Sequence, residues 1–429
     1  MLFAIVKQLR RRHGHPPLTS VPLRRLGLPA FLAVLGPGLL AGLSDDDPAG
    51  ITTYSIIGAR YGHTLLWVLL LSVAALVVFH ELGARLGLAT GQGLVSLVRS
   101  SYGQRSAIVV TATLVAANAG TTCAEFAGVA AGLQLAGVTR YVSVPAAAVL
   151  VGFVVLRGSF HRIEHLLLLL STVFVAYAVA AFLAHPDWRA AGRGLVVPEL
   201  PVNRDALVAV TATVGTTLAP WGLCFIQSYA ADKRLTSSDL RFERIEVFSG
   251  AILTGVIGGF VVVACAATLH ASGRLEIDDA RDAAAALEPI SGQLASTLFG
   301  LGLVGAALLA AAVVPLSTAY SVSEAFGREA RLDDSLREAR VFYATYLGIL
   351  GVGALVVLVP GVPLVPILFL TQVLNAVLLL PLLVAMRRLG RDRRVLGELS
   401  NGVGADVVTL AALAVVACSI AALAIAVLL

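Results

Sequence analysis

The sequence has few charged residues for its length. Only 13% of its 429 residues are Asp, Glu, Lys or Arg, whereas a soluble domain carries about a quarter. The hydrophobic share is 58% and the mean hydropathy is +0.89. This composition excludes a soluble globular protein. It predicts an all-α integral membrane protein, because the apolar runs are far longer than β-barrel strands and do not alternate in polarity.

Sulfur-containing residues are also scarce. The four cysteines lie singly in apolar segments without a CxxC pair, so neither a zinc site nor a disulfide framework is indicated. The only methionines are Met1 and Met386. The stretch HELGA, which begins at His80, lacks the second histidine of a zinc protease motif, and no nucleophile is placed beside a base. We therefore expect no enzymatic activity and no cofactor.

Long apolar stretches predict about eleven membrane-spanning helices. They lie near residues 27–61, 64–88, 107–135, 142–156, 163–184, 206–230, 246–269, 293–323, 341–360, 363–386 and 405–429. No linker divides them, so one transmembrane domain, 1–429, is expected. We expect contact with a lipid bilayer and a monomeric state, with a dimer as the alternative.

The basic residues are distributed unevenly between the two sides of the membrane. Only seven of the 31 Lys and Arg residues fall on the segments of one side. This bias predicts a cytoplasmic N-terminus in a bacterial-type cytoplasmic membrane, and the odd number of spans then places the C-terminus outside. Because the basic residues lie between apolar runs, the net charge of +5 does not indicate nucleic-acid binding.

The stretch GLSDDDPAG, residues 42–50, places Asp45, Asp46 and Asp47 between apolar segments. A carboxylate at the bilayer centre costs about 2.5–3.5 kcal/mol to insert, so three together require water or a cation. In the alternative interpretation the aspartates form an ordinary outer loop, and Asp47 caps a helix that begins at Pro48. The first segment alone leaves both interpretations open.

A second stretch repeats the pattern of the first. DPAG at residues 47–50 and APWG at residues 219–222 both read X-Pro-X-Gly, five predicted spans apart. Proline removes a backbone N–H and glycine relaxes the backbone, so each pair is expected to interrupt its helix. Paired interruptions in inverted halves are typical of a transporter's substrate site. We expect one repeat at 27–184, a second at 206–386, and an extra C-terminal helix at 405–429.

Five stretches of this sequence resemble a known family, the Nramp (natural-resistance-associated macrophage protein) metal transporters. They are GPGLLAGLSDDDPAGITTYS, ELGARLGLATGQGL, CAEFAGVAAGLQLAG, RIEHLLLLLS and TQVLNAVLLLPLL, which are similar to segments one, two, three, five and ten of that family. The resemblance covers nearly the whole chain. It implies a LeuT-type fold of inverted five-helix repeats, with a divalent cation bound between broken helices one and six.

The resemblance also implies a set of metal-site residues. The family's motif aspartate falls on Asp47, its metal-binding asparagine on Gly50, its methionine on Ala219 and its glutamine on Gln372. Asp47 is then the primary ligand, the Ala219 carbonyl and Gln372 complete the shell, and Asp45 and Asp46 act as attractors or outer-shell ligands. The candidate metal-site residues are Asp45, Asp46, Asp47, Gly50, Thr217, Ala219 and Gln372.

Departures from the family pattern indicate which ion is carried. The thioether of transition-metal Nramps has no substitute here, and carboxylate, carbonyl and water ligands suit Mg²⁺ and Mn²⁺. Mg²⁺ keeps several waters, for which the small residues Gly50 and Ala219 leave room. The stretch TTLAPW, which has no methionine, is similar to the Nramp-related magnesium transporter branch. It predicts a secondary transporter that imports Mg²⁺, and also Mn²⁺.

The residues at the family's proton-coupling positions also depart from the family pattern. The family's acidic residue in the third helix falls on Thr122 and its histidine in the sixth helix falls on Trp221, while Glu125 remains as a coupling candidate. Uncoupled, potential-driven transport is the leading hypothesis. One alternative is a proton-coupled Mn²⁺/Fe²⁺ symporter that uses Glu125. Another is an amino-acid or organic-anion carrier on the same fold, which the acidic triplet disfavours because it repels anions.

Overall fold

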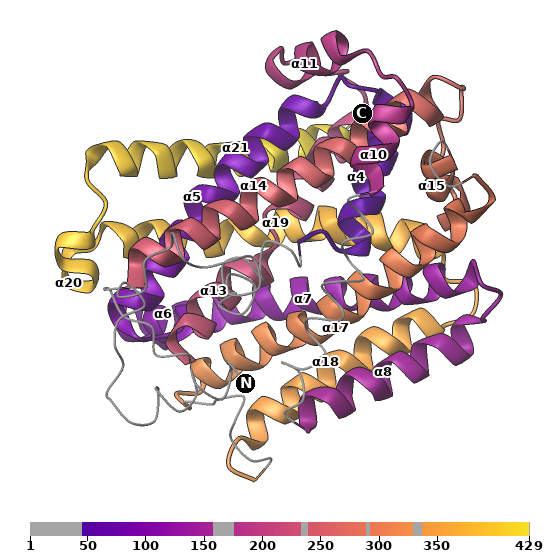
Figure 1. The fold of residues 1–429 in the computed structure, drawn as a ribbon. Coiled ribbons are helices and arrows are strands. Elements are labelled where there is room, and N and C mark those ends of the chain that lie inside the picture. The colour runs from indigo at the N-terminus through magenta and orange to yellow at the C-terminus, as the bar shows by residue number, and fades with distance from the viewer. Residues whose placement is uncertain (1–44, 158–175, 233–238, 289–291, 329–336, 429) are drawn as a thin grey trace, which may run out of the picture.

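The computed structural model describes residues 45–157, 176–232, 239–288, 292–328 and 337–428. Regular structure in these ranges is helical, without a β-strand (Figure 1). The start of the first predicted span and most of the fifth lie outside the described residues. The helices are α4 (Pro48–Tyr61), α5 (Leu66–Thr90), α6 (Leu94–Tyr102), α7 (Gln104–Gln134), α8 (Arg140–Leu156), α10 (Ala176–Leu183), α11 (Trp188–Val196), α12 (Arg204–Thr217), α13 (Pro220–Asp232), α14 (Leu240–Cys265), α15 (Ala280–Ala284), α17 (Ala295–Ala325), α18 (Arg340–Leu358), α19 (Leu364–Arg391), α20 (Arg393–Leu396) and α21 (Val403–Leu428). The π-helical turn η5 (Ala266–His270) continues α14, and 3₁₀ turns lie at η6 (Ala285–Leu287), η7 (Gly292–Leu294) and η8 (Gly397–Leu399).

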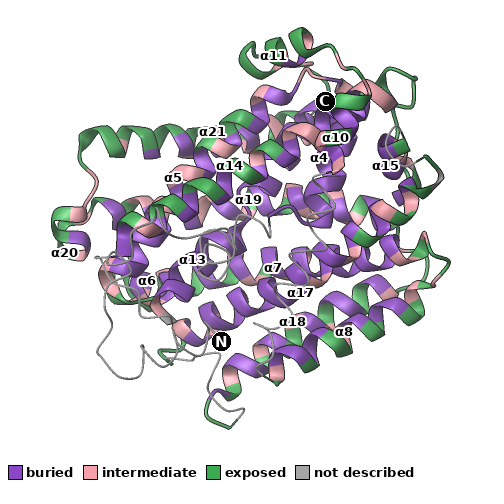
Figure 2. Cartoon of the chain, viewed as in Figure 1, coloured by how far each residue is buried: buried purple, intermediate pink, exposed green. Residues whose placement is uncertain are grey.

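Among the described residues, eight helical spans are long and apolar enough to cross a membrane. They coincide with the predicted second, third and sixth to eleventh spans, and the shorter α8 coincides with the fourth. In the most apolar 18 residues of each span, burial reaches 94% for α12 with α13 but only 22% for α21. Figure 2 shows this contrast, with α21 mostly exposed. The sixth span is therefore central, and the exposed apolar face of α21 suits a lipid environment.

The short helices α4 and α13 lie in the middle of the molecule. In Figure 1 they are placed between α5 and α14 on one side and α7 and α17 on the other. Both begin at a proline, Pro48 in α4 and Pro220 in α13. This arrangement brings two helix ends, rather than two continuous helices, into the core.

The sixth span is broken, as predicted. Helix α12 ends at Thr217, and Leu218 leaves the helical region with φ −107° and ψ 60°. Proline favours a break at this point, because it has no N–H to donate and its ring clashes with the carbonyl four residues earlier. Proline alone does not force the break, since α8, α17 and α19 each continue through one. The next helix, α13, starts at Pro220 itself, where a proline is tolerated.

Two glycines allow neighbouring helices to approach these breaks. A Cβ atom on Gly128 of α7 would overlap the ring of Pro48, and one on Gly215 of α12 would overlap the backbone of Gln372 in α19. Glycine is the only residue that permits such close backbone contact. The start of α4 and the end of α12 are therefore held tightly by α7 and α19.

Candidate functional site

The three consecutive aspartates lie before the first turn of α4 and are buried. Their exposed fractions are 2% for Asp45, 3% for Asp46 and 4% for Asp47. The four side-chain oxygens of Asp45 and Asp46 have no hydrogen-bond partner. A buried carboxylate without a donor or a counter-ion is strongly unfavourable. The outer-loop interpretation predicted that Asp47 caps α4, which it does, but the burial of the triplet does not fit an exposed loop.

Asp47 and Gly50 form the turn that starts α4. Asp47 Oδ1 accepts the Gly50 N–H at 2.6 Å, which leaves the second carboxylate oxygen for another partner. A Cβ on Gly50 would lie 3.1 Å from the Asp45 carbonyl oxygen and 3.2 Å from the Thr216 hydroxyl oxygen. The missing side chain of Gly50 thus leaves a small space bordered by oxygen atoms from the start of α4 and from the break after α12.

Glu125 of α7 faces Asp47. Its side chain is fully buried and lies close to the Asp47 carboxyl group. Neither oxygen of Glu125 has a donor. Two carboxylates accept but do not donate, so this pair requires a proton or a cation between its members. The coupling candidate is therefore directly beside the predicted primary ligand.

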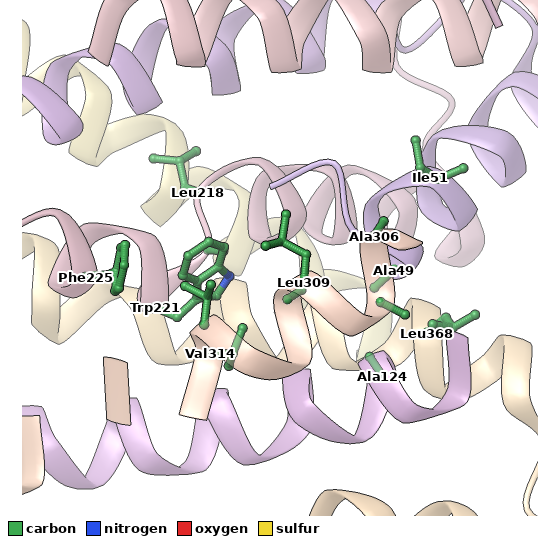
Figure 3. Close-up of a cluster of buried hydrophobic side chains, with 14 of the residues drawn as sticks. Ala49, Ile51, Ala124, Leu218, Trp221, Phe225, Ala306, Leu309, Val314 and Leu368 are labelled. Atoms are coloured by element: carbon green, nitrogen blue, oxygen red, sulfur yellow. The ribbon is translucent and has the colours of Figure 1, made fainter. Parts of the chain in front are cut away.

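The second break contributes backbone oxygen rather than side chains. The Ala219 carbonyl accepts the Gly222 N–H at 3.2 Å and retains a second lone pair. The Trp221 carbonyl accepts the hydroxyl of Ser317 from α17 at 2.9 Å. Figure 3 shows Leu218 and Trp221 of this break together with Leu309 of α17 among the buried apolar side chains. Apolar side chains thus surround the break.

Thr217 and Thr216 differ in what their hydroxyl groups contact. The Thr217 hydroxyl donates to the Thr213 carbonyl at 2.8 Å and lies 3.1 Å from the hydroxyl of Tyr54 in α4. The Thr216 hydroxyl has no partner and lies beside Gly50. Thr217 therefore connects α12 to α4, and Thr216 is the threonine that faces the space between the breaks.

Gln372 lies in a small polar network between α19 and α7. Its side-chain oxygen accepts from Asn375 Nδ2 at 3.0 Å, and the same nitrogen lies 3.0 Å from the Thr121 hydroxyl oxygen. Its Nε2 has no partner. The Gln372 backbone packs on Gly215, one residue before Thr216. The network therefore borders the break from the α19 side.

The comparison with known families decides the identity of this arrangement. A family model described as Natural resistance-associated macrophage protein-like matches residues 38–426. The chain belongs to the Nramp family.

Individual relatives agree with this assignment. The chain is 32% identical over 314 residues to a divalent metal cation transporter MntH of Yersinia enterocolitica, covering 70% of this chain and 73% of that protein. It is 27% identical over 383 residues to the MntH protein of Granulibacter bethesdensis, covering 86% and 83%.

Solved structures confirm the fold of this Nramp chain. The manganese transporter of Eremococcus coleocola matches with a TM-score of 0.73 at 17% identity, covering 94% of this chain and 90% of that one. Mhp1, a nucleobase-cation-symport-1 family transporter, matches with a TM-score of 0.56 at 16% identity, covering 91% and 92%. The predicted LeuT-type fold is confirmed.

Cavities lie near the end of α7. A cavity of about 250 Å³ lies there beside α15, lined by residues that include Asp278, Asp279 and Arg281. Near Thr52, one turn after Pro48, the free space is about 10 Å³. This volume holds about one water molecule.

Hydrogen bonds join the helices at the other end. Both oxygens of Glu324 in α17 are engaged: one accepts the Ser228 hydroxyl at 2.7 Å, and the other accepts the N–H groups of Val95 and Ser96 at 3.0 and 3.1 Å. Gln227 Nε2 donates to the Gln92 carbonyl at 3.1 Å. These bonds connect α13 to α17 and to the start of α6.

The structure brings together most of the predicted residues without forming a complete carboxylate cage. In the ranges that it describes, no three His, Cys, Asp or Glu side chains are placed to hold one metal ion. Asp47, Gly50 and Glu125 lie together, the Thr216 hydroxyl adjoins Gly50, and the Gln372 backbone packs on Gly215. A cation here would be held by few carboxylate oxygens, carbonyls and water. The sequence analysis did not assign Thr216 to the site, although it adjoins the second break.

Proposed function

We propose that this protein is a secondary transporter that imports Mg²⁺ and Mn²⁺ across the cytoplasmic membrane without coupling to protons. The observation that carries the proposal is the buried aspartate triplet, because the four oxygens of Asp45 and Asp46 have no donor at a helix break. Such a group of acceptors in a low-dielectric core requires protons or a cation, and a dication can serve several carboxylates at once. The MntH relatives and the manganese transporter named above support a divalent metal cargo.

The donor atoms favour hard cations. Asp47 offers a carboxylate oxygen, Ala219 a carbonyl and Thr216 a hydroxyl, while Gly50 leaves space for water. Oxygen ligands suit Mg²⁺ and Mn²⁺, whereas sulfur ligands select later transition metals. Met386 does not supply a thioether to the break, since its Cε packs near Gly83 of α5. This set of ligands supports a cation that keeps part of its water shell.

The residues at the coupling positions support uncoupled transport. Thr122 donates its hydroxyl to the Asn118 carbonyl at 2.7 Å and carries no titratable proton. Trp221 is fully buried, and its indole does not titrate in the physiological range. An inside-negative potential contributes about 2.3 kcal/mol per charge per 100 mV, and twice that for a dication, so accumulation needs no proton.

The second candidate is a proton-coupled symporter, and the contact between Glu125 and Asp47 favours it. Proteoliposomes containing a pH-sensitive dye separate the two. For the uncoupled transporter we expect Mn²⁺ and Mg²⁺ uptake that follows the imposed potential while the internal pH stays constant. Glu125→Gln should then still transport. Acidification in proportion to Mn²⁺ uptake, abolished in Glu125→Gln, would establish the symporter instead.

A further inference from the structure

His80 lies in the middle of α5 and is buried without a hydrogen-bond partner. Its exposed fraction is 0%, and neither ring nitrogen has a partner. A neutral imidazole has one N–H donor and one acceptor nitrogen, so burial leaves both groups unsatisfied. Buried polar groups are normally hydrogen-bonded, and an exception calls for a ligand or another explanation.

The imidazole of His80 and the carboxylate of Asp45 meet at Gly222, in the first turn of α13. The His80 Nε2 atom lies 3.5 Å from the position of a Cβ on Gly222, and Asp45 Oδ1 lies 3.6 Å from the same position. Both oxygens of Asp45 also have no partner. An unpartnered nitrogen and an unpartnered carboxylate therefore border one space that exists because residue 222 has no side chain.

The space at Gly222 lies on the α13 side of Asp47. Helices α5 and α13 run side by side beyond it, with Gly83 against the Leu223 carbonyl and Gly87 against the backbone of Gln227. Past these contacts lie the bonds of Gln227 and Ser228 described above. A cation that leaves Asp47 along α13 thus passes His80 before it reaches Glu324.

We propose that Asp45 and His80 form a second cation position, at Gly222, which receives the ion from Asp47 and discriminates between Mn²⁺ and Mg²⁺. This inference rests on the proposed transport of divalent cations. Imidazole nitrogen is a good ligand for first-row transition metals and a poor one for Mg²⁺, which prefers oxygen. No third His, Cys, Asp or Glu of the described residues joins the pair, so water completes the coordination.

Packing alone does not explain the gap at Gly222. A methyl group there would make ordinary van der Waals contacts at 3.5 and 3.6 Å, so α5 and α13 do not need glycine in order to approach at this position. In a helix, alanine is also more favourable than glycine by about 1 kcal/mol. Gly222→Ala should therefore fold, while its methyl group fills the space between the nitrogen and the oxygen.

Pulsed EPR of the purified full-length protein loaded with Mn²⁺ tests the contact directly. We expect a ¹⁴N coupling from an imidazole ligand in the wild type. It should be lost in His80→Leu and in Gly222→Ala. Gly83→Ala is the matched control, because its new methyl group would also contact the α5–α13 interface, at 3.4 Å, but faces the Leu223 carbonyl and Met386. It should retain the signal. Absence of ¹⁴N coupling in the wild type, or its persistence in His80→Leu, overturns the proposal.

Uptake by proteoliposomes supplies the second measurement. At subsaturating ion, the ratio of Mn²⁺ to Mg²⁺ uptake should fall by about tenfold in His80→Leu, the order of loss typical when a group supporting a metal site is removed. An unchanged ratio in folded His80→Leu contradicts the second position while leaving the Asp47 site intact. If Asp47→Ala instead transports like the wild type, the proposed function itself fails. The presence or absence of ¹⁴N coupling in the wild-type protein tests the second cation position even if His80→Leu does not fold.

Discussion

Two groups of three aspartates in this molecule each lie at the start of a helix, but they differ in burial and in hydrogen bonding. Asp47 caps α4 after Asp45 and Asp46, and Asp279 caps α15 between Asp278 and Asp282. In the α15 group, Asp279 Oδ1 accepts two N–H groups, and Asp282 accepts the N–H groups of Asp278 and Asp279 at 3.0 and 3.1 Å. Asp278 and Asp279 are exposed, whereas Asp45 and Asp46 are buried without a partner.

This difference in burial shows that the local sequence alone does not determine whether a group of aspartates can bind a cation. Both groups satisfy the preference for Asp at a helix N-terminus. In the α15 group, water and backbone N–H groups stabilise the charges. In the α4 group the side chains are buried among the surrounding helices, so the carboxylates need protons or a cation. We refer to the two groups as the buried trio (Asp45, Asp46, Asp47) and the surface trio (Asp278, Asp279, Asp282).

The strongest test of the comparison removes the capping aspartate of each trio. In Asp47→Ala, Mg²⁺ and Mn²⁺ uptake should fall by more than about 100-fold, because losing a primary ligand exceeds the 10–100-fold loss typical of supporting groups. In Asp279→Ala, uptake should change by less than about twofold. Only the helix cap is lost there, at about 1 kcal/mol of stability. Initial uptake rates in proteoliposomes measure transport by both variants, and melting temperatures in detergent measure their stability. Equal loss of uptake in Asp47→Ala and Asp279→Ala would contradict the proposed difference between the two trios.

A smaller effect is expected when the packing around the buried trio is changed. Gly128→Ala places a methyl group against the ring of Pro48, directly after Asp47. Overpacking of this kind costs about 1–3 kcal/mol, and the displaced turn should reduce uptake by about tenfold. Gly192→Ala is the control, since nothing lies within 4 Å of its new methyl group. If Gly128→Ala transports at the wild-type rate, the position of α4 relative to α7 does not define the site.

The smallest contrast compares neutralised carboxylates that do not cap a helix. Asp46→Asn should lower uptake by about threefold to tenfold, because a charge in a buried site is barely screened. Asp278→Asn should have almost no effect at physiological salt, where the Debye length is about 8 Å and its exposed charge is screened. Uptake at low and at physiological ionic strength measures the difference. A larger loss in Asp278→Asn than in Asp46→Asn would contradict the comparison.

Much of the fold could be predicted from the sequence, because the membrane restricts the chain to helices and hydropathy locates them. The break at Pro220 was predicted from the repeated X-Pro-X-Gly pattern, and the start of α4 at Pro48 from the rules for helix capping. The burial of the trio could not be predicted, since both interpretations of GLSDDDPAG place the same residues at the same helix end. Only the packing of α7 and α12 distinguishes them.

The directions of the side chains at the site could not be predicted from the sequence either. Thr216 and Thr217 are adjacent and chemically identical, and only the helix end decides which hydroxyl faces Gly50. His80 was considered only as part of an incomplete protease motif. The rule that an ionisable residue inside an apolar span is a functional candidate had selected Glu125, and it applies equally to His80.

Anomalous X-ray diffraction from crystals grown with Mn²⁺ tests the central claim most directly. The account predicts a manganese peak between the start of α4 and the break before α13, in contact with an oxygen of Asp47. It predicts no peak of comparable height at Asp278 or Asp279. A peak at the surface trio alone, with the buried trio empty at saturating Mn²⁺, would contradict it.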